Sequence, residues 1–275
     1  MSKIEKLMNK SFLERTISGI LLVIIALVTI IIGNDVLFVV IAATSLIGLS
    51  ELYKVFKIEK KMPGIVGYIG CIGYYTLIRS GNDEYLLPMM LTVLMLVMAV
   101  FVFSFPKYQA NQIMAVFFGI VYVAIMLSYV YRTRMMVNGV YIVWLIFLCS
   151  WGCDTCAYLV GVMFGKHKMA PVLSPKKSVE GGIGGIVGAA LLGFIYTMIF
   201  ADIFVKLNHY MIMVPVMCAV AAMVSQVGDL AASGIKRNYD VKDYGKLIPG
   251  HGGILDRFDS VIFTAPIIYY FVLYL

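Results

Sequence analysis

The sequence predicts an all-α, polytopic integral membrane protein. The chain has 275 residues, of which 61% are hydrophobic and only 13% are charged, whereas a soluble domain carries about 25% charged residues. Its mean hydropathy is +0.93. The apolar residues are gathered into runs that are long enough to cross a hydrocarbon core as helices. Lipid is therefore expected to surround much of the chain, which has no separate soluble domain.

About nine apolar runs can serve as transmembrane helices, since a crossing needs roughly 17–25 helical residues. We place these runs at residues 17–33, 36–56, 63–79, 86–105, 112–131, 139–164, 182–201, 210–234 and 258–275. The short link at Asn34 and Asp35 predicts a tight helical hairpin. Residues 1–15 are amphipathic and are expected to form an interfacial helix along the headgroups.

The basic residues predict the orientation, because Lys and Arg concentrate on the cytoplasmic side of a membrane protein. Of the 22 Lys and Arg residues, most fall on the side of the N-terminus, and the other side holds Arg79, Arg132, Arg134 and Lys206. The N-terminus is therefore predicted to be cytoplasmic, as are the two longest loops. No transit-peptide-like extension precedes the first run, which favours the plasma (inner) membrane of a bacterium.

The chain is predicted to have two regions. Residues 1–140 supply about five N-terminal spans with the interfacial helix, and residues 141–275 supply about four spans with the two long cytoplasmic loops. The net charge of +7 lies between apolar spans rather than along one face. Anionic lipid headgroups and phosphate-bearing substrates are therefore the expected partners, and nucleic acid is not.

Several carboxylates lie at or near membrane depth, where each costs roughly 2.5–3.5 kcal/mol and so needs a partner or a function. Asp154 lies well inside the sixth run, and its own helix offers no basic partner, which favours a function. Glu51 is close to Lys54, so a buried ion pair or an interface-level charge is the simpler interpretation. Three more lie near the cytoplasmic ends of the last two runs: Asp229, Asp256 and Asp259.

The loop at about residues 235–257 has the composition of a phosphate site. Its positive charges come from Lys236, Arg237, Lys242, Lys246 and Arg257. The turn from Pro249 to Gly253 is rich in glycine, so its backbone can approach a ligand closely and present N–H groups. His251, within this turn, is a candidate to hydrogen-bond phosphate.

Clustered carboxylates among cations also indicate divalent metal ions that bridge to phosphate. Oxygen ligands suit Mg²⁺, which takes only one or two protein carboxylates and keeps several waters. Zinc is not expected, because the three histidines are scattered. The pair Cys153 and Cys156 lies in an apolar run and is interpreted as ordinary packing rather than as a metal or redox site.

The other long loop, at about residues 165–181, carries Ser174, Lys176, Lys177 and Ser178. These residues resemble a phosphate-holding turn that leads into a glycine-rich helix, although a cytoplasmic loop would explain the lysines without any function. The glycines near this loop are interpreted as close helix-packing contacts. They are Gly161, Gly165, Gly181, Gly182, Gly184, Gly185 and Gly188.

The stretch from Ser233 to Asp259 resembles the signature of the CDP-diacylglycerol synthases, also called phosphatidate cytidylyltransferases. The matching residues, all in register, are Ser233, Lys236, Arg237, Lys242, Asp243, Gly245, Pro249, His251, Gly252, Gly253, Asp256, Arg257 and Asp259. The resemblance extends to the Ser174–Gly182 loop and to Asp154 with Tyr158. The first 140 residues resemble the family only as hydrophobic spans.

This resemblance implies an enzyme that joins CTP to phosphatidate, giving CDP-diacylglycerol and pyrophosphate for phospholipid biosynthesis. It implies a two-cation site in which Asp229 and Asp256 are the metal ligands, with Mg²⁺ and a second ion that could be monovalent, and a homodimer. The residues to which we assign catalytic roles are Asp229, Asp256, Lys236, Arg237 and Arg257. Those to which we assign substrate binding are Ser174, Lys176, Lys177, Ser178, Ser233, Lys242, Asp243, Lys246, His251, Gly252, Gly253, Asp154 and Asp259.

Two other functions stay open. A related CTP-dependent nucleotidyltransferase could act on another lipid phosphate, and only its lipid-facing pocket would differ. A membrane transporter would place charges near the midplane, in broken helices or inverted repeats. Asp154 suits a transporter, but the two cytoplasmic loops would then have no function.

Overall fold

The computed structural model of the chain describes residues 10–205 and 209–274, with side chains from residue 17 onward. Residues 1–9 of the predicted interfacial helix lie outside this part, and residues 10–15 are the start of α2 (Lys10–Ile32). The described residues are helical apart from turns, loops and one two-stranded hairpin, β1 (Lys168–Ala170) and β2 (Ser174–Ser178). The prediction of an all-α polytopic membrane protein is confirmed, and the hairpin lies in a loop where no strand was expected.

Helices cover all nine predicted runs, and among the described residues six are long and apolar enough to cross a membrane. These six are Asn34–Val55, Asp83–Phe103, Ala110–Arg134, Gly139–Phe164, Val179–Ile199 and Tyr210–Asn238. In α2 (Lys10–Ile32) the apolar part, Ile17–Ile32, is shorter. Helices α4 (Met62–Ser80) and α13 (Leu255–Tyr274) cover the two remaining runs. A count of nine crossings and a cytoplasmic N-terminus stay predictions.

The chain packs as two compact units. Unit 1 comprises Met1–Ile125 and Val241–Arg257, and unit 2 comprises Met126–Asp240 and Phe258–Leu275. The loop before α13 thus belongs with the N-terminal helices, although it is far from them in sequence. The division at residue 140 made from the sequence describes regions of function and stays a prediction.

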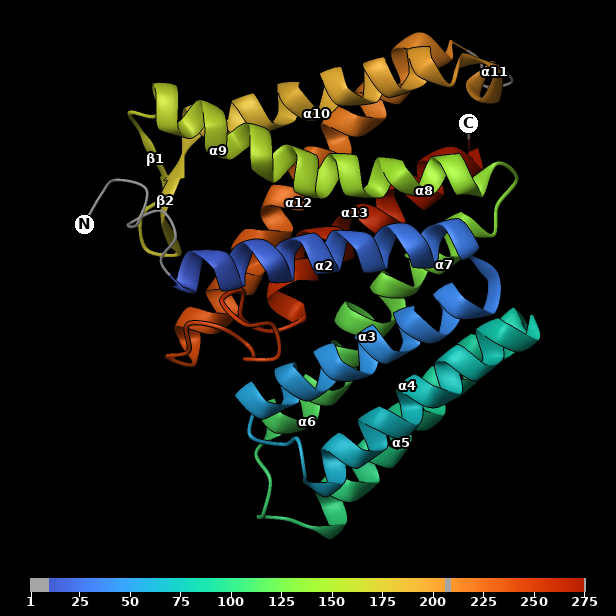
Figure 1. Cartoon of the computed structure of the whole chain (residues 1–275). Helices are drawn as coiled ribbons and strands as arrows, with labels where there is room; N and C mark the ends of the chain where they lie inside the picture. The colour runs from blue at the N-terminus through green and yellow to red at the C-terminus, as the bar shows by residue number, and fades with distance from the viewer. Residues whose placement is uncertain (1–9, 206–208, 275) are drawn as a thin grey trace. The chain divides into compact units, whose positions relative to one another are not determined.

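Unit 1 contains α2, α3 (Asn34–Val55), α4, α5 (Leu86–Phe103), α6 (Ala110–Gly119) and the short segments η1 (Asp83–Tyr85) and η2 (Ile120–Ile125). Helices α2 and α3 form the predicted hairpin, joined at Gly33 with a positive φ of 68° (Figure 1). The fully buried Tyr53 donates its hydroxyl to the Val116 carbonyl at 2.9 Å. A Cβ on Gly119 would come within 2.7 Å of its ring, so the glycine makes room for the tyrosine.

Unit 2 contains α7 (Met126–Arg134), α8 (Gly139–Phe147), the π-helical segment η3 (Leu148–Gly152), α9 (Cys153–Phe164), the hairpin, α10 (Val179–Ile199), α11 (Ala201–Phe204), α12 (Tyr210–Asn238) and most of α13. Helices α9 and α10 run side by side (Figure 1). A Cβ on Gly184 or Gly188 would come within 2.5 Å of Val160 or Cys156, respectively. The packing interpretation of these two glycines is therefore confirmed, and the five cysteines are free thiols.

Candidate active site

The C-terminal part of α12 carries the first group of predicted residues. This helix continues to Asn238, so the segment from Ser233 to Arg237, part of which was expected in the following loop, is helical. Residues four and seven positions apart lie on one face of a helix. Asp229, Ser233 and Lys236 therefore share a face, which places a carboxylate, a hydroxyl and an ammonium group in a row.

The hairpin brings a second cation to this face. Lys177 of β2 forms an ion pair with Asp229, and about a quarter of each side chain is exposed, 26% and 24% respectively. The two strands pair antiparallel, with Lys168 opposite Ser178 and Ala170 opposite Ser174. The predicted phosphate-holding turn is therefore a defined hairpin that delivers lysines to α12.

Ser178 joins the hairpin to α10. Its hydroxyl caps the helix by accepting the Gly181 N–H at 3.2 Å. A Cβ on Gly161, Gly165 or Gly181 would come within 3.1, 2.7 and 2.9 Å of this hydroxyl oxygen. The sequence therefore needs glycine at these positions for the backbone to close around Ser178, and Ser178 is part of the scaffold as well as a candidate for substrate binding.

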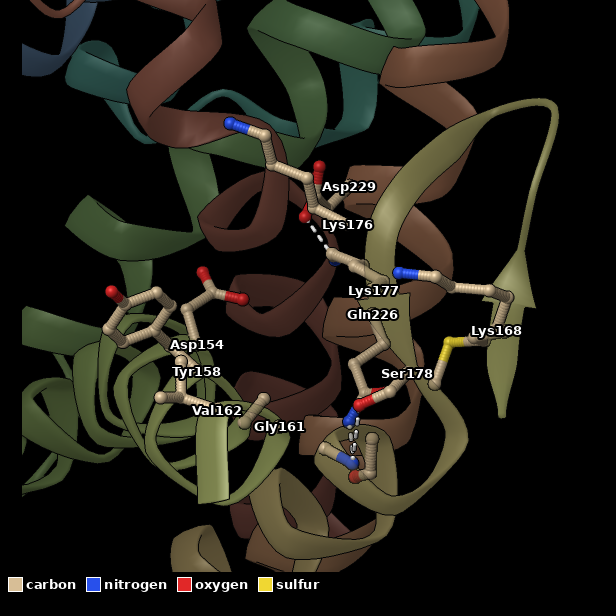
Figure 2. Close-up of a pocket in the computed structure, with 14 residues that line it drawn as sticks. Asp154, Tyr158, Gly161, Val162, Lys168, Lys176, Lys177, Ser178, Gln226 and Asp229 are labelled. Atoms are coloured by element: carbon tan, nitrogen blue, oxygen red, sulfur yellow. Dashed lines mark hydrogen bonds and ion pairs between the residues drawn. The ribbon is translucent and has the colours of Figure 1, made fainter. Parts of the chain in front are cut away.

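A cavity of about 480 Å³ opens between α9, the hairpin, α10 and α12, all within unit 2 (Figure 2). Its lining includes the predicted residues Asp154, Lys176, Lys177, Ser178 and Asp229. The rim on α9 is apolar and outward-facing, since Tyr158 and Val162 are 71% and 68% exposed. One end of the cavity is therefore basic and the other is suited to hydrocarbon.

Two polar residues of the lining were missed from the sequence, Lys168 and Gln226. Lys168 lies in the loop already singled out, but nothing in its immediate sequence distinguishes it from the neighbouring Lys166. The buried Gln226 donates to the Gly182 carbonyl at 2.9 Å, which ties α12 to α10. Its position three residues before Asp229 on α12 was the available signal.

Acidic side chains gather in the same unit. The Asp259 carboxylate is 8% exposed and interacts electrostatically with Asp229, Lys236 and Asp154. Asp154 lies two residues after the end of the π-helical segment η3, and its Oδ2 accepts the Ser260 hydroxyl at 3.3 Å. π-Helical turns within long helices occur frequently at functional sites. Asp154 therefore has a polar partner and also lines the cavity.

The residues present fit a magnesium ion in donor chemistry but do not form a complete cage. Within the described ranges, no group of three or more His, Cys, Asp or Glu side chains is arranged to hold a metal ion. Mg²⁺ takes one or two carboxylates and completes its shell with water and substrate phosphate. Asp229 belongs to unit 2 and Asp256 to unit 1. The two-cation site that combines them stays a prediction.

Unit 1 holds the second group of predicted residues in the loop before α13. Ile248 and Gly252 form an isolated antiparallel β-bridge, in which the Ile248 N–H donates to the Gly252 carbonyl at 2.9 Å. Gly250 and Gly252 have positive φ values of 73° and 87°. The loop encloses a cavity of about 470 Å³. Its lining is Lys242, Asp243, Gly245, Lys246, Ile248, Pro249, Gly250, His251, Gly252 and Arg257. Six of the predicted site residues thus line one strongly basic hollow.

Asp256 organises this loop from the first turn of α13. Its buried Oδ2 accepts the backbone N–H groups of Tyr244 at 2.8 Å and Gly253 at 2.9 Å. A Cβ on Gly252 would lie 2.9 Å from the same oxygen. The carboxylate predicted as a metal ligand is therefore also the acceptor around which the glycine-rich turn closes.

Glu51 corrects an expectation from the sequence. It was interpreted as a buried ion pair or an interface-level charge close to Lys54, but its buried carboxylate accepts the N–H of Ile254 at 3.0 Å and of Leu255 at 2.8 Å. An N-terminal helix therefore contacts the signature loop. No local signal could have found this, because the partners are about 200 residues away.

The remaining predicted residues line neither of the two cavities. They are Ser174, Ser233, Lys236, Arg237, Gly253, Asp256 and Asp259. Ser174 begins β2, three of them lie on α12, and Gly253 donates to Asp256.

The fold and these sites define a polytopic membrane protein with two basic hollows suited to phosphate groups. The model of the cytidylyltransferase family matches residues 13–275. Phosphatidate cytidylyltransferases from Staphylococcus saprophyticus and Staphylococcus haemolyticus are 32% and 33% identical to the chain, and each alignment covers 92% of this chain and 96% of the relative. The protein of that name from Staphylococcus aureus is 33% identical over 259 residues. The chain belongs to the cytidylyltransferase family and is a membrane-embedded nucleotidyltransferase.

Proposed function

We propose that the chain is a phosphatidate cytidylyltransferase, which joins CTP to phosphatidate and releases pyrophosphate, so feeding phospholipid biosynthesis. The observation that carries the proposal is the basic cavity of unit 1, whose lining includes Lys242, His251 and Arg257 of the family-like signature together with Lys246. Relatives that match almost the whole chain carry this enzyme name. The proposal also accounts for a second, amphipathic cavity in unit 2.

Each cavity suits one substrate. The unit 1 cavity is polar, and its three cationic side chains, Lys242, Lys246 and Arg257, can pair with a triphosphate, so we assign CTP to it. The unit 2 cavity combines Lys168, Lys176 and Lys177 with an apolar rim on α9, so we assign the lipid phosphate to the lysines and the acyl chains to the rim.

The reaction is a substitution at the α-phosphorus of CTP. A phosphate oxygen of phosphatidate forms a bond to this phosphorus, the bond to the β-phosphate oxygen breaks, and pyrophosphate leaves with the electron pair. The lipid phosphate is already an anion at neutral pH, so the site needs charge neutralisation and alignment rather than a strong base. The cationic side chains of the two cavities hold the phosphates. Bound Mg²⁺, with Asp229 and Asp256 as proposed ligands, would neutralise further phosphate charge.

The setting follows from the substrates, because CTP is soluble and phosphatidate is a lipid. We propose that the protein spans the plasma membrane of a bacterium with both loops on the cytoplasmic side, in agreement with the distribution of its basic residues. A homodimer is proposed on family resemblance alone.

The direct test uses purified protein in detergent with labelled CTP, phosphatidate and Mg²⁺. We expect label to enter a lipid-soluble nucleotide with one pyrophosphate released for each, and chelation of Mg²⁺ to stop both. Product with another lipid phosphate but not with phosphatidate would support the related transferase. Absence of any product in protein that remains folded would contradict the proposal and leave the transporter.

Replacing Lys168 by alanine is expected to raise the KM for phosphatidate roughly tenfold, the effect of losing one charge-assisted hydrogen bond of about 1.5 kcal/mol. The KM for CTP should stay within about twofold. Steady-state kinetics with each substrate varied in turn measures both values. Lys166→Ala is the matched control, because Lys166 lies in the same loop outside the cavity lining. A rise in the KM for CTP instead would assign this cavity to the nucleotide.

A further inference from the structure

The signature loop is attached to helices that the signature does not include. Glu51 lies in α3, and its carboxylate reaches backbone groups 203 and 204 residues further along the chain. The Ser18 hydroxyl of α2 donates to the Pro249 carbonyl at 2.8 Å. A Cβ on Gly19 would lie 3.6 Å from the His251 ring. The position of the loop within unit 1 is thus determined by α2 and α3.

The Glu51 carboxylate lies in a close-fitting backbone cradle. It is 8% exposed, and its two oxygens receive the N–H groups of Ile254 and Leu255 separately. A Cβ on Gly245 would come within 2.2 Å of Oε1, and a Cβ on Gly253 within 2.4 Å of Oε2. Only glycine allows the loop to approach this closely from both of its arms. Glu51 therefore joins the two arms of the loop at the point where α13 begins.

Burying the Glu51 carboxylate carries a desolvation cost. A buried carboxylate is expensive unless hydrogen bonds and nearby charges compensate for its desolvation. An apolar side chain would fill the same volume at lower cost, but it would leave the N–H groups of Ile254 and Leu255 without this acceptor. The geometry favours a residue that fixes the direction of the chain as it enters α13.

We propose that Glu51 is a positioning residue for the transfer reaction. Its carboxylate holds the loop segment that connects the cationic residues of the unit 1 cavity to Asp256. The cationic residues and Asp256 then keep the alignment that the phosphates require. The inference rests on the proposed function for its kinetic consequences. Its structural content, that Glu51 holds the loop, does not depend on the reaction.

The main test is Glu51→Gln, which keeps the size of the side chain. An amide has one acceptor oxygen, so one of the two N–H groups must face an NH₂ group. We expect kcat to fall roughly 10–100-fold, as when a supporting residue or the alignment of reacting groups is lost. The KM for CTP should rise, and the KM for phosphatidate, assigned to the other unit, should stay within about twofold. Glu51→Asp should recover part of the lost kcat, because it keeps both acceptor oxygens.

The matched control is Glu59→Gln. Glu59 is a carboxylate in the same unit that accepts the Ser50 hydroxyl at 3.2 Å. The Glu59→Gln variant should leave kcat and both KM values unchanged. Hydrogen exchange in detergent gives a readout besides activity. The amides of residues 245–256 should exchange faster in Glu51→Gln than in Glu59→Gln, while those of α12 should not change.

A combination of variants tests the contact itself. Gly245→Ala alone should lower turnover, because its Cβ would collide with the Glu51 carboxylate. Shortening Glu51 to aspartate withdraws the carboxylate by one methylene. The fold loss of turnover in the double variant Glu51→Asp with Gly245→Ala should therefore be smaller than the product of the two single fold losses.

Wild-type kinetics for Glu51→Gln, or unchanged exchange in the loop, would overturn the inference while the proposed function stands. If the wild-type protein makes no lipid nucleotide, the proposed function fails. Faster loop exchange in Glu51→Gln would still support the structural role.

Discussion

Replacing Asp229 by asparagine is expected to lower CTP-dependent lipid product roughly 10³-fold, the size of effect seen when a group that stabilises transition-state charge is removed. Asp229 lies on α12, pairs with Lys177 and interacts with the buried Asp259. The amide keeps the shape of the side chain and removes its charge. Its proposed role in holding a cation and its ion pair with Lys177 both depend on that charge.

The assay for Asp229→Asn is product formation over a range of Mg²⁺ concentrations. If the carboxylate holds the ion, the residual activity should need at least about tenfold more Mg²⁺ for half-saturation. Asp35→Asn is the control, because Asp35 also forms an ion pair, with Arg79 at 2.6 Å, but in an exposed position. Normal turnover by folded Asp229→Asn would remove the residue from the proposed metal site.

Asp256→Asn is expected to lower turnover by a similar factor, roughly 10³-fold, with the loop largely intact. The amide oxygen of asparagine can still accept the N–H groups of Tyr244 and Gly253, which now bond to Oδ2. This variant therefore removes the charge of the side chain while it keeps the hydrogen bonds that hold the loop. The protein should keep its unfolding temperature in detergent while losing lipid product.

Asp256→Ala supplies the comparison, because it removes both the charge and the acceptor. Each buried N–H group left without a partner costs about 1–3 kcal/mol. This variant should therefore lose turnover and also unfold at a lower temperature. Equal unfolding temperatures for the alanine and asparagine variants would show that the hydrogen bonds to Oδ2 do not hold the loop. Normal turnover by Asp256→Asn would exclude a catalytic charge at this position.

The positions of the helices could be predicted closely from the sequence. The sixth predicted run, 139–164, coincides with the helical segment Gly139–Phe164. The hairpin at Asn34 is also confirmed. These features are local, because hydrophobicity over about twenty residues and a short polar link suffice to define a helix that can span lipid.

The chemistry of the loops was predicted in part. Six predicted residues of the last loop line the unit 1 cavity, and five others line the unit 2 cavity. Residue type and proximity in the chain were enough to group them. The β-hairpin and the extension of α12 to Asn238 were not predicted, because pairing across a turn and the length of a polar helical end depend on neighbouring elements.

By itself the sequence determined the class of protein, the places of its helices and the residue types available for phosphate. Only the tertiary structure decided which backbone groups each buried carboxylate holds. Glu51 was taken for an interfacial charge and proved to hold the loop before α13, while Asp256 proved to accept two N–H groups of that loop. The physical reason is that the residue type of a carboxylate does not specify its hydrogen-bond partners. Packing between distant segments brings the N–H groups to it.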